Sequence, residues 1–395
     1  MKRLMILGAG PNQIPLIKAA KKNGYYVIAC DYNENAPGVK LADELCLASI
    51  MDREAVLEKA KELKLDGVIS NSEPAMPIVA YVGNALGLPS NDYETVAAMG
   101  DKFKFRTLLK KNGFTVPGFG SAEAYEEAKA LFESLNKPVM IKPAASSGSR
   151  GVVKLETDEQ LKEAFDDAQH YSRNDKVILE EYIDNTCGHI VGGDIFVSNG
   201  KVVFWGLMSC IRSDNCPLVP MGKAFPAILS NEQSAAVKSE IIRAIEKLGI
   251  AFCAINVEAM INRQGEACFI ELNPRNGGNY IPDVLKSATG FDIFDATVRA
   301  AVGDSVEADD GKVCVPYITY QVNSNKDGIL KTVNFSDEVK PLIEMYLPDI
   351  QVGEKVERFI NADKRIGIVF LRFDSIEQRD RILSNIEDHI FVEVE

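Results

Sequence analysis

The sequence lacks the features that mark secreted, membrane-spanning or zinc-binding proteins. Its 395 residues include only three histidines and eight cysteines, and no two cysteines are spaced as CxxC. We therefore expect no zinc site and reduced thiols. No run of about 18 apolar residues occurs, so no membrane-spanning helix is expected. The apolar residues 4–7 are too few for the core of a signal peptide, and we expect a cytoplasmic protein.

Basic residues are also scarce. The chain has 44 Lys and Arg against 57 Asp and Glu, which gives a formal net charge of −13. This charge argues against nucleic acid or an anionic membrane as the main partner. Hydrophobic residues make up 46% of the chain and fall in periodic segments, which excludes a disordered protein. At roughly 100–200 residues per domain, the length predicts about two to four domains.

The order of the predicted elements indicates an α/β part followed by α+β parts. The first 90 residues alternate short apolar runs with amphipathic stretches of helical spacing. This alternation predicts a doubly wound parallel sheet with helices on both faces. From residue 137 one strand follows another, and Asn199-Gly200 marks a hairpin turn, so the sheet there should be mostly antiparallel. A long helix should end at Gly249, and residues after about 310 should be strand-rich.

A glycine-rich turn follows the first apolar run, at Gly8-Ala9-Gly10. Glycines at such a turn let the backbone approach a phosphate at a helix N-terminus. A dinucleotide fingerprint needs a third glycine where this chain has Gln13, although Asp31 ends the second strand as a ribose-binding acid would. An NAD(P)-dependent oxidoreductase therefore stays open as an alternative, beside a turn that is only structural.

A lysine and a Gly/Ser loop form the second motif. Lys142 ends an apolar strand, and residues 146–151 read SSGSRG before the next strand. The loop amides of Ser146, Ser147, Gly148, Ser149 and Gly151 are suited to phosphate oxygens, with Lys142 as a point charge beside them. A solvated hairpin loop would have the same composition.

Two carboxylates in neighbouring apolar strands form the third motif. Glu258 and Glu271 are 13 residues apart with a turn between them, so antiparallel strands would bring them together. Carboxylates at such positions are costly to bury unless they are paired or bind a cation, and Mg²⁺ prefers oxygen ligands. Asn273 shares the face of Glu271, and Arg275 follows as a phosphate- or carboxylate-binding residue. The alternative is a simple ion pair between Glu271 and Arg275.

These motifs, in this order, resemble the ATP-grasp superfamily, in particular the single synthetase unit of carbamoyl phosphate synthase, biotin carboxylase and the amino-acid ligases. The resemblance covers residues 1–305 and rests on Lys102 in DKFKFR, Lys142 with its loop, LEEYI, INVEAMI and IELNPRNGGN. It implies a pre-ATP-grasp α/β domain at 1–95, a helical connector at 96–120, a small lid domain at 121–183, a larger domain at 184–305 and a C-terminal α+β domain at 306–395.

The resemblance also implies roles for individual residues. Lys102 and Lys142 would contact the phosphates of ATP, with residues 146–151 as a mobile loop above them. Glu180, Glu181 and Ile183 would line the adenine, mainly through backbone groups. Glu258, Glu271 and Asn273 would hold Mg²⁺, or Mn²⁺ in its place, and Arg275 would face the transferred phosphoryl group. After the strand of Glu181 the chain has no acid at the usual ribose position, so His189 or Asp194 would take that role.

The substrate side gives fewer indications. Glu73 follows a strand of the first sheet and is a candidate for a substrate amine, or a helix N-terminal acid. Arg212 and Lys223 are candidates for a substrate carboxylate, or solvated loop charges. Gly277 and Gly278 would admit a substrate close to the backbone.

The expected function is an ATP-dependent, ADP-forming carboxylate–amine ligase that works through an acyl phosphate. Its acid and amine would be small molecules, with amino acids, phosphoribosylamine or glycine types and bicarbonate as candidates. A catalytically silent nucleotide-binding protein is a third hypothesis, beside the ligase and the oxidoreductase. Because the chain carries one synthetase unit and not two, complete carbamoyl phosphate synthesis is not expected. Relatives are often dimers, which makes a homodimer the candidate assembly.

Overall fold

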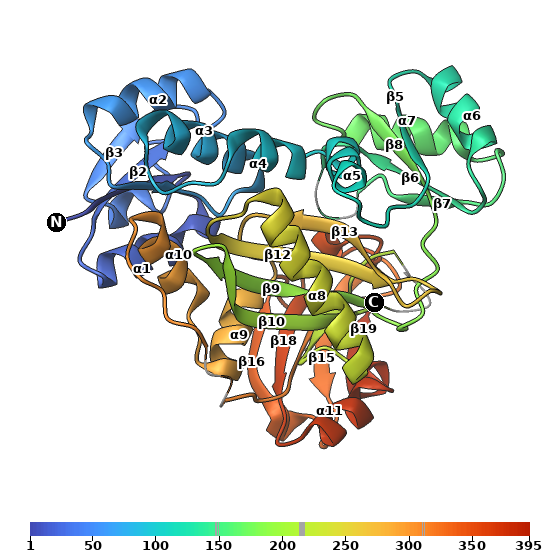
Figure 1. Cartoon of the computed structure of the whole chain (residues 1–395). Helices are drawn as coiled ribbons and strands as arrows, with labels where there is room; N and C mark the ends of the chain where they lie inside the picture. Colours follow the sequence, from blue (N-terminus) through green and yellow to red (C-terminus); the bar gives the residue numbers. More distant parts are fainter. Residues whose placement is uncertain (147, 149, 213–217, 310, 312) are drawn as a thin grey trace.

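The computed structural model describes residues 1–146, 148, 150–212, 218–309, 311 and 313–395. Its first part is a parallel sheet in the order β3-β2-β1-β4, built from β1 (Arg3–Leu7), β2 (Tyr26–Asp31), β3 (Glu44–Leu47) and β4 (Gly67–Ile69). Helices α1 (Ile14–Lys22), α2 (Arg53–Glu62) and α3 (Met76–Leu86) surround the sheet (Figure 1). Strands β1, β2 and β4 are largely buried apolar runs, as expected for a sheet covered on both faces, whereas the edge strand β3 buries only Cys46. This part agrees with the predicted doubly wound unit.

Two helices, α4 (Tyr93–Met99) and α5 (Lys102–Lys111), lead to a second, antiparallel sheet. Its order is β5-β8-β6-β7, from β5 (Phe119–Ala122), β6 (Val139–Pro143), β7 (Val153–Leu155) and β8 (Val177–Glu181). Helices α6 (Tyr125–Ser134) and α7 (Leu161–Tyr171) bury Phe132 and Phe165 against it. In Figure 1 this small unit lies beside the first one, and both lie above the third sheet.

The third sheet is the largest, in the order β13-β12-β9-β10-β11-β14-β18-β16. Its strands are β9 (Ile190–Ser198), β10 (Lys201–Ile211), β11 (Gly222–Phe225), β12 (Cys253–Ile261), β13 (Ala267–Asn273), β14 (Tyr317–Val322), β16 (Ile343–Pro348) and β18 (Gly367–Arg372). The β9–β10 turn has positive φ at Asn199 and Gly200, which confirms the predicted hairpin. All pairs in this sheet are antiparallel, as expected.

The C-terminal residues extend this sheet and add a small one beside it. Strands β15 (Gly328–Phe335), β17 (Lys355–Val356) and β19 (Ile390–Val394) pair in the order β17-β15-β19, and α11 (Ile376–Leu383) lies near them. Because β14, β16 and β18 belong to the large sheet, that sheet crosses the boundary predicted at residue 305. The division into five domains stays a prediction. In the described residues no helix has both the length and the apolarity that a membrane span needs.

The two faces of the large sheet differ. On one face α8 (Asn231–Leu248) covers an apolar cluster that includes Ile255 and Val257. On the other, α9 (Ile281–Thr289) and α10 (Ile293–Ala301) cover apolar residues at one end of the strands, among them Ala254 and Phe225. Farther along the same strands and on the same face come Asn256, Glu258 and Lys223, because side chains two apart share a face. This polar half of the face is the floor of the candidate site.

Candidate active site

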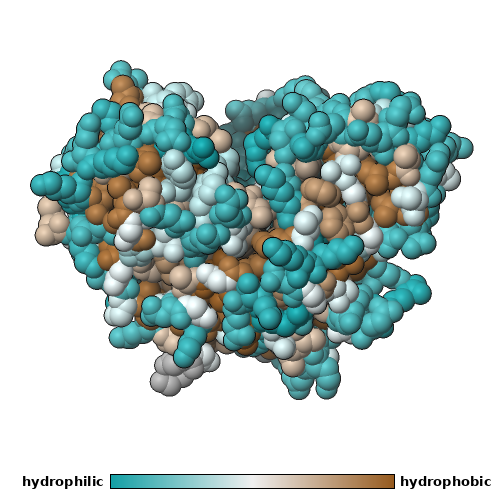
Figure 2. All heavy atoms as spheres, turned by 45° about the horizontal axis from the view of Figure 1, so that its top comes forward, coloured by the Kyte–Doolittle hydropathy of each residue, from teal (hydrophilic) through white to brown (hydrophobic). Residues whose placement is uncertain are grey.

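A cavity of about 790 Å³ lies where the three parts of the chain meet. The small sheet forms one wall, the polar half of the large sheet forms the floor, and the first unit contributes Glu73. Figure 2 shows the molecular surface hollowed between the two upper lobes. The cavity is lined by most of the predicted site residues: Glu73, Lys102, Lys142, Ser146, Gly148, Glu180, Glu181, Ile183, Arg212, Lys223, Glu258, Glu271, Arg275 and Gly278.

Lys102 and Glu271 form the centre of the cavity. Asp101 caps α5 by accepting a hydrogen bond from the Lys104 amide, and this places Lys102 in the first helical turn. Lys102 Nζ lies 2.8 Å from Glu271 Oε1 and donates to the carbonyl of Ser146 at 2.9 Å. Burial alone would raise the pKa of Glu271, but the attraction of Lys102 and other cations outweighs it and lowers this pKa to about 2.

The predicted pair of carboxylates is formed. Glu258 and Glu271 are direct partners in the β12–β13 register, and both line the cavity. Asn273 is buried beside them, and its amide nitrogen donates to Glu271 Oε2 at 3.0 Å. The ion pair of Glu271 with Arg275, which the sequence left open, is not the arrangement found, since Glu271 pairs with Lys102. Within the described residues no group of three or more His, Cys, Asp or Glu side chains is arranged as metal ligands.

Arg275 leaves the end of β13 and reaches the first unit. Its guanidinium lies 2.9 Å from Glu73 Oε2, across 202 residues of sequence. The other Glu73 oxygen lies 3.5 Å from Arg173, which follows α7 of the small unit. Glu73 therefore joins all three parts, and its carboxylate already has cationic partners. Its role as the amine ligand stays a prediction.

Asp194 supports the loop that follows Arg275. It is fully buried on β9, and its carboxylate accepts hydrogen bonds at 2.8 Å from the Gly277 amide and from Asn256 Nδ2. Asn256 in turn donates its backbone amide to the Arg275 carbonyl. Burial raises the pKa of Asp194 to about 6, against the effect of these hydrogen bonds. Because both carboxylate oxygens are engaged, Asp194 is not placed for a ribose, and Gly277 packs behind the cavity without lining it.

Lys223 is a buried lysine on β11. It lines the cavity, and its Nζ donates to the thiol of Cys210 at 2.7 Å. A Cβ on Gly192 would lie 2.8 Å from both Lys223 Nζ and Cys210 Sγ, so the lysine side chain crosses β10 to lie over this glycine. Lys223 is thus held in the site and is not a solvated loop charge. Arg212 lines this cavity and a second one.

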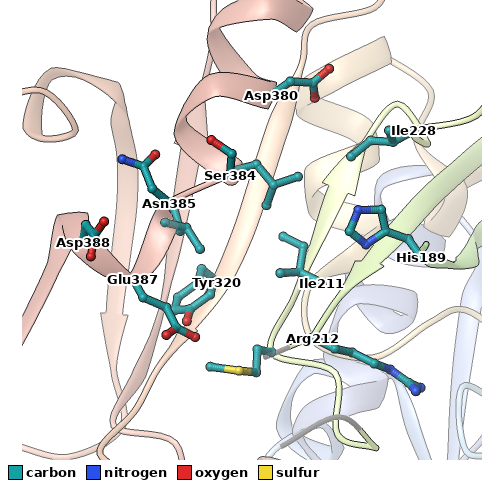
Figure 3. A pocket seen from close by; sticks show the side chains of 13 residues that line it. His189, Ile211, Arg212, Ile228, Tyr320, Asp380, Ser384, Asn385, Glu387 and Asp388 are labelled. Carbon is teal, nitrogen blue, oxygen red and sulfur yellow. The ribbon is translucent and has the colours of Figure 1, made fainter. Parts of the chain in front are cut away.

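The second cavity holds His189. It measures about 860 Å³ and lies between the large sheet and the C-terminal residues 380–388. Figure 3 shows His189 and Ile211 on one side of it and Ser384, Asn385 and Glu387 on the other. His189 does not line the first cavity, so the structure does not bring it together with the other predicted nucleotide residues. His189 thus lies apart from the other predicted nucleotide residues, and its role as the ribose ligand stays a prediction.

The Gly/Ser loop is described only in part. Ser146 and Gly148 line the cavity, while Ser147 and Ser149 lie outside the described residues. Gly151 has a φ of +65° and packs against α7, where a Cβ would lie 3.0 Å from Ala168 Cα. Gly151 therefore closes the base of the loop and does not line the cavity.

The N-terminal glycine turn is filled by the protein itself. A Cβ on Gly8 would meet the Gln13 side chain at 3.1 Å, and Asp31 Oδ2 accepts a hydrogen bond from the Ala9 amide at 2.7 Å. Asp31 Oδ1 accepts from the Asn33 amide. The carboxylate expected to bind a ribose is thus engaged with the backbone, and we do not retain the oxidoreductase alternative.

Several lining residues were not identified from the sequence, among them Arg106 and Gln321. Arg106 is fully buried on α5, 2.9 Å from Glu180 in β8. Its position one helical turn after Lys102 was the available signal, because residues i and i+4 share a helix face. Gln321 on β14 is 2% exposed, and its amide nitrogen donates to the Pro220 carbonyl at 2.9 Å. Its strand lies in the segment to which the sequence assigned no chemistry.

Comparisons with known proteins agree with this geometry. The family model "Carbamoyl-phosphate synthase L chain, ATP binding domain" matches residues 101–308. The 2-oxoglutarate carboxylase small subunit of Hydrogenobacter thermophilus is 27% identical over 77% of this chain and 67% of its own length. The chain spans 59% and 29% of two carbamoyl phosphate synthase sequences that it also matches.

Solved structures share the fold over the whole chain. Phosphoribosylglycinamide synthetase from Anaerococcus prevotii is 25% identical, with a TM-score of 0.73 over 100% of both chains. The L-amino acid ligase from Bacillus licheniformis is 21% identical, with a TM-score of 0.80 over 100% of this chain and 99% of its own. The biotin carboxylase domain of the Hydrogenobacter carboxylase, a dimer solved with magnesium ADP and bicarbonate, is 20% identical, with a TM-score of 0.70 over 100% and 91%. The predicted fold, a parallel α/β unit followed by an antiparallel ATP-grasp fold, is confirmed.

Proposed function

The chain belongs to the family of the carbamoyl-phosphate synthase L chain ATP-binding domain, among the ATP-grasp ligases, and from this premise we propose that it joins a small-molecule carboxylate to an amine at the expense of ATP. The observation that carries the proposal is the convergence of Lys102, Lys142 and Arg275 on one cavity that also holds Glu258 and Glu271. The second cavity has a single Lys or Arg among the described residues of its lining, Arg212, beside Asp380, Glu387 and Asp388, so it offers no comparable set of cations for a triphosphate.

The residues present fit magnesium and a nucleoside triphosphate. Glu258 and Glu271 offer two hard oxygen donors side by side, which suits a cation that completes its shell with phosphate oxygens and water. We assign Mg²⁺ to these carboxylates and Asn273. When bound, the ion would neutralise charge on the transferred phosphoryl group. Lys102 and Lys142 are assigned to the phosphates, and the hinge residues Glu180, Glu181 and Ile183 to the adenine, since they line the wall beside Lys142.

The reaction we propose has two steps. In the first, an oxygen of the substrate carboxylate attacks the γ-phosphorus, the bond from this phosphorus to the bridging oxygen of ADP breaks, and ADP leaves. In the second, an amine attacks the acyl carbon, phosphate leaves with the carbon–oxygen bonding pair, and the amine loses a proton. Arg275 and Lys223 hold the acid, and the buried lysines stabilise the phosphoryl charge. The chain's contribution is mainly positioning and electrostatics.

The acid and the amine are left as classes: amino acids, phosphoribosylamine or glycine types, and bicarbonate. The first assay would measure ADP release from MgATP across these compounds, singly and in pairs. Stimulation by one pair would support the ligase and identify its substrates. Binding of MgATP without ADP release from any pair would favour the silent nucleotide-binding protein. We also propose a homodimer, and the mass in solution would test it.

The metal assignment is tested by Glu271→Gln. We expect this variant to lose ADP formation and to remain folded, because the amide keeps the shape of the side chain but gives up its charge. Glu266→Gln is the matched control, since Glu266 is exposed at the tip of the same β12–β13 hairpin, outside the cavity. Turnover by Glu271→Gln equal to that of Glu266→Gln would reject the assignment.

A further inference from the structure

Arg106 is a fully buried arginine that connects three elements around the cavity. It extends from α5, and its Nε lies 2.9 Å from Glu180 Oε1 in β8 of the small sheet. Its Nη1 donates to the Ile270 carbonyl in β13 of the large sheet at 3.0 Å. One side chain thus joins the connecting helix to both sheets between which the cavity lies. The planar guanidinium suits this task because it presents several donors in fixed directions.

Glu180 also forms an ion pair with Lys142. Glu180 is 3% exposed, and its second oxygen lies 2.6 Å from Lys142 Nζ. Arg106, Glu180 and Lys142 therefore form a buried row of alternating charge with Lys142 at its end. Burial would raise the pKa of Glu180, but the two cations outweigh it and lower this pKa, so Glu180 carries its negative charge.

This row gives a reason for burying Arg106 beside the cavity that requires no contact between Arg106 and the substrate. If Glu180 were paired with Lys142 alone, its negative charge would neutralise the positive charge of the lysine that faces the phosphates. With Arg106 on the other side, two cations balance Glu180, so the row carries net positive charge beside the phosphate site even though burial and the nearby Arg106 lower the pKa of Lys142. Removing one partner of a buried ion pair leaves the other uncompensated.

We propose that Arg106 is a positioning residue of the nucleotide site, which acts through Glu180 to hold Lys142 in place and to offset the negative charge of Glu180 beside the phosphates of ATP. This inference rests on the proposed binding of MgATP in the cavity. In this proposal Arg106 does not contact the nucleotide, and its effect on the binding of MgATP depends on the presence of Glu180.

A double-mutant cycle measured by calorimetry tests the inference and needs no knowledge of the acid or the amine. The Kd of MgATP is measured for the wild type, Arg106→Met, Glu180→Gln and the double variant. We expect Arg106→Met to weaken binding by about 10-fold or more in the wild-type background, the range typical of residues that orient a ligand-binding group. In the Glu180→Gln background, where there is no charge to share, the same substitution should change Kd by less than about 3-fold.

Arg379→Met is the matched control for loss of a buried arginine. Arg379 is 1% exposed and pairs with Asp380, away from the lining of the cavity. Its substitution should leave the Kd of MgATP unchanged even where it lowers stability. Equal effects of Arg106→Met in both backgrounds, a wild-type Kd in Arg106→Met, or an equal loss in Arg379→Met would each overturn the inference. A wild-type protein that does not bind MgATP would instead refute the proposed function and the inference with it.

Discussion

We expect the substitution Gly277→Ala, which adds a single carbon atom, to disturb the geometry of the site strongly. A Cβ there would lie 2.7 Å from Asp194 Oδ1, 2.8 Å from Asn256 Nδ2 and 2.9 Å from Ile281 Cδ1. All three distances are shorter than carbon contacts in folded proteins allow. Asp194 and Asn256 are bonded to each other and buried, so neither can turn aside without losing a hydrogen bond. The Gly277→Ala variant must therefore move the loop that carries Arg275.

The size of the effect follows from this geometry. Overpacking of a closed site of this kind costs about 1–3 kcal/mol of unfolding free energy. The loss of activity should be greater than the loss of stability suggests, because a misplacement of about 1 Å in a catalytic group can lower the rate by about 100-fold. We expect kcat for ADP formation to fall by about 10- to 100-fold. The Kd of MgATP should change little, since Lys102, Lys142 and Glu180 stand on other elements.

The neighbouring glycine supplies the control. A Cβ on Gly278 would meet nothing within 4 Å, so Gly278→Ala makes the same change one residue away without the collision. Urea unfolding and ADP release would be measured for both variants. Equal stability and equal kcat of Gly277→Ala and Gly278→Ala would show that the contact of Asp194 with this loop does not position Arg275.

Two further predictions concern the same floor. Gly192→Ala would put a Cβ 2.8 Å from both Lys223 Nζ and Cys210 Sγ, which are buried and bonded to each other. We expect a loss of about 1–3 kcal/mol of unfolding free energy and a KM for the acid raised by about 10-fold; an unchanged KM would remove Lys223 from the acid site. Burial raises the pKa of Asp194 from 3.8 to about 6, so the folded protein holds this proton more tightly than the unfolded chain does. The resulting stabilisation is complete below pH 3.8 and is lost as the pH rises through 6. Relative to Asp194→Asn, the wild type should therefore lose about 2 kcal/mol of unfolding free energy between about pH 4 and pH 7.5 in urea titrations, and a constant difference would contradict the shift.

The parts of the site that could be predicted are those that local rules determine. Glu258 and Glu271 could be paired because an antiparallel hairpin with a short turn fixes which residues face each other. Lys102 could be placed at a helix start because Asp101 is a capping residue. The alternation of strands and helices in the first 90 residues gave the parallel sheet for the same kind of reason.

Contacts between distant segments could not be predicted. Arg106 meets Glu180 across 74 residues, and Glu73 meets Arg275 across 202. Local sequence periodicity does not predict such pairs. A charged residue in an amphipathic helix is expected to be exposed to solvent unless its partner is known. The place of His189 in the second cavity could not be predicted for a related reason, since it depends on how the small sheet sits on the large one. The membership of β14 in the large sheet depends on pairing at long range as well.

The charge around the cavity explains how an acidic chain can bind a polyanion. The chain as a whole has a formal net charge of −13, yet among the described residues that line the first cavity there are eight Lys or Arg side chains and five Glu. Pairs such as Lys102 with Glu271 and Arg275 with Glu73 hold cations in position, but they do not cancel the excess. An excess of positive charge in a partly closed cavity is unfavourable without a counter-ion, and a phosphate chain supplies one. The net negative charge of the rest of the chain repels anions, so the local excess of positive charge directs a small anion to this cavity.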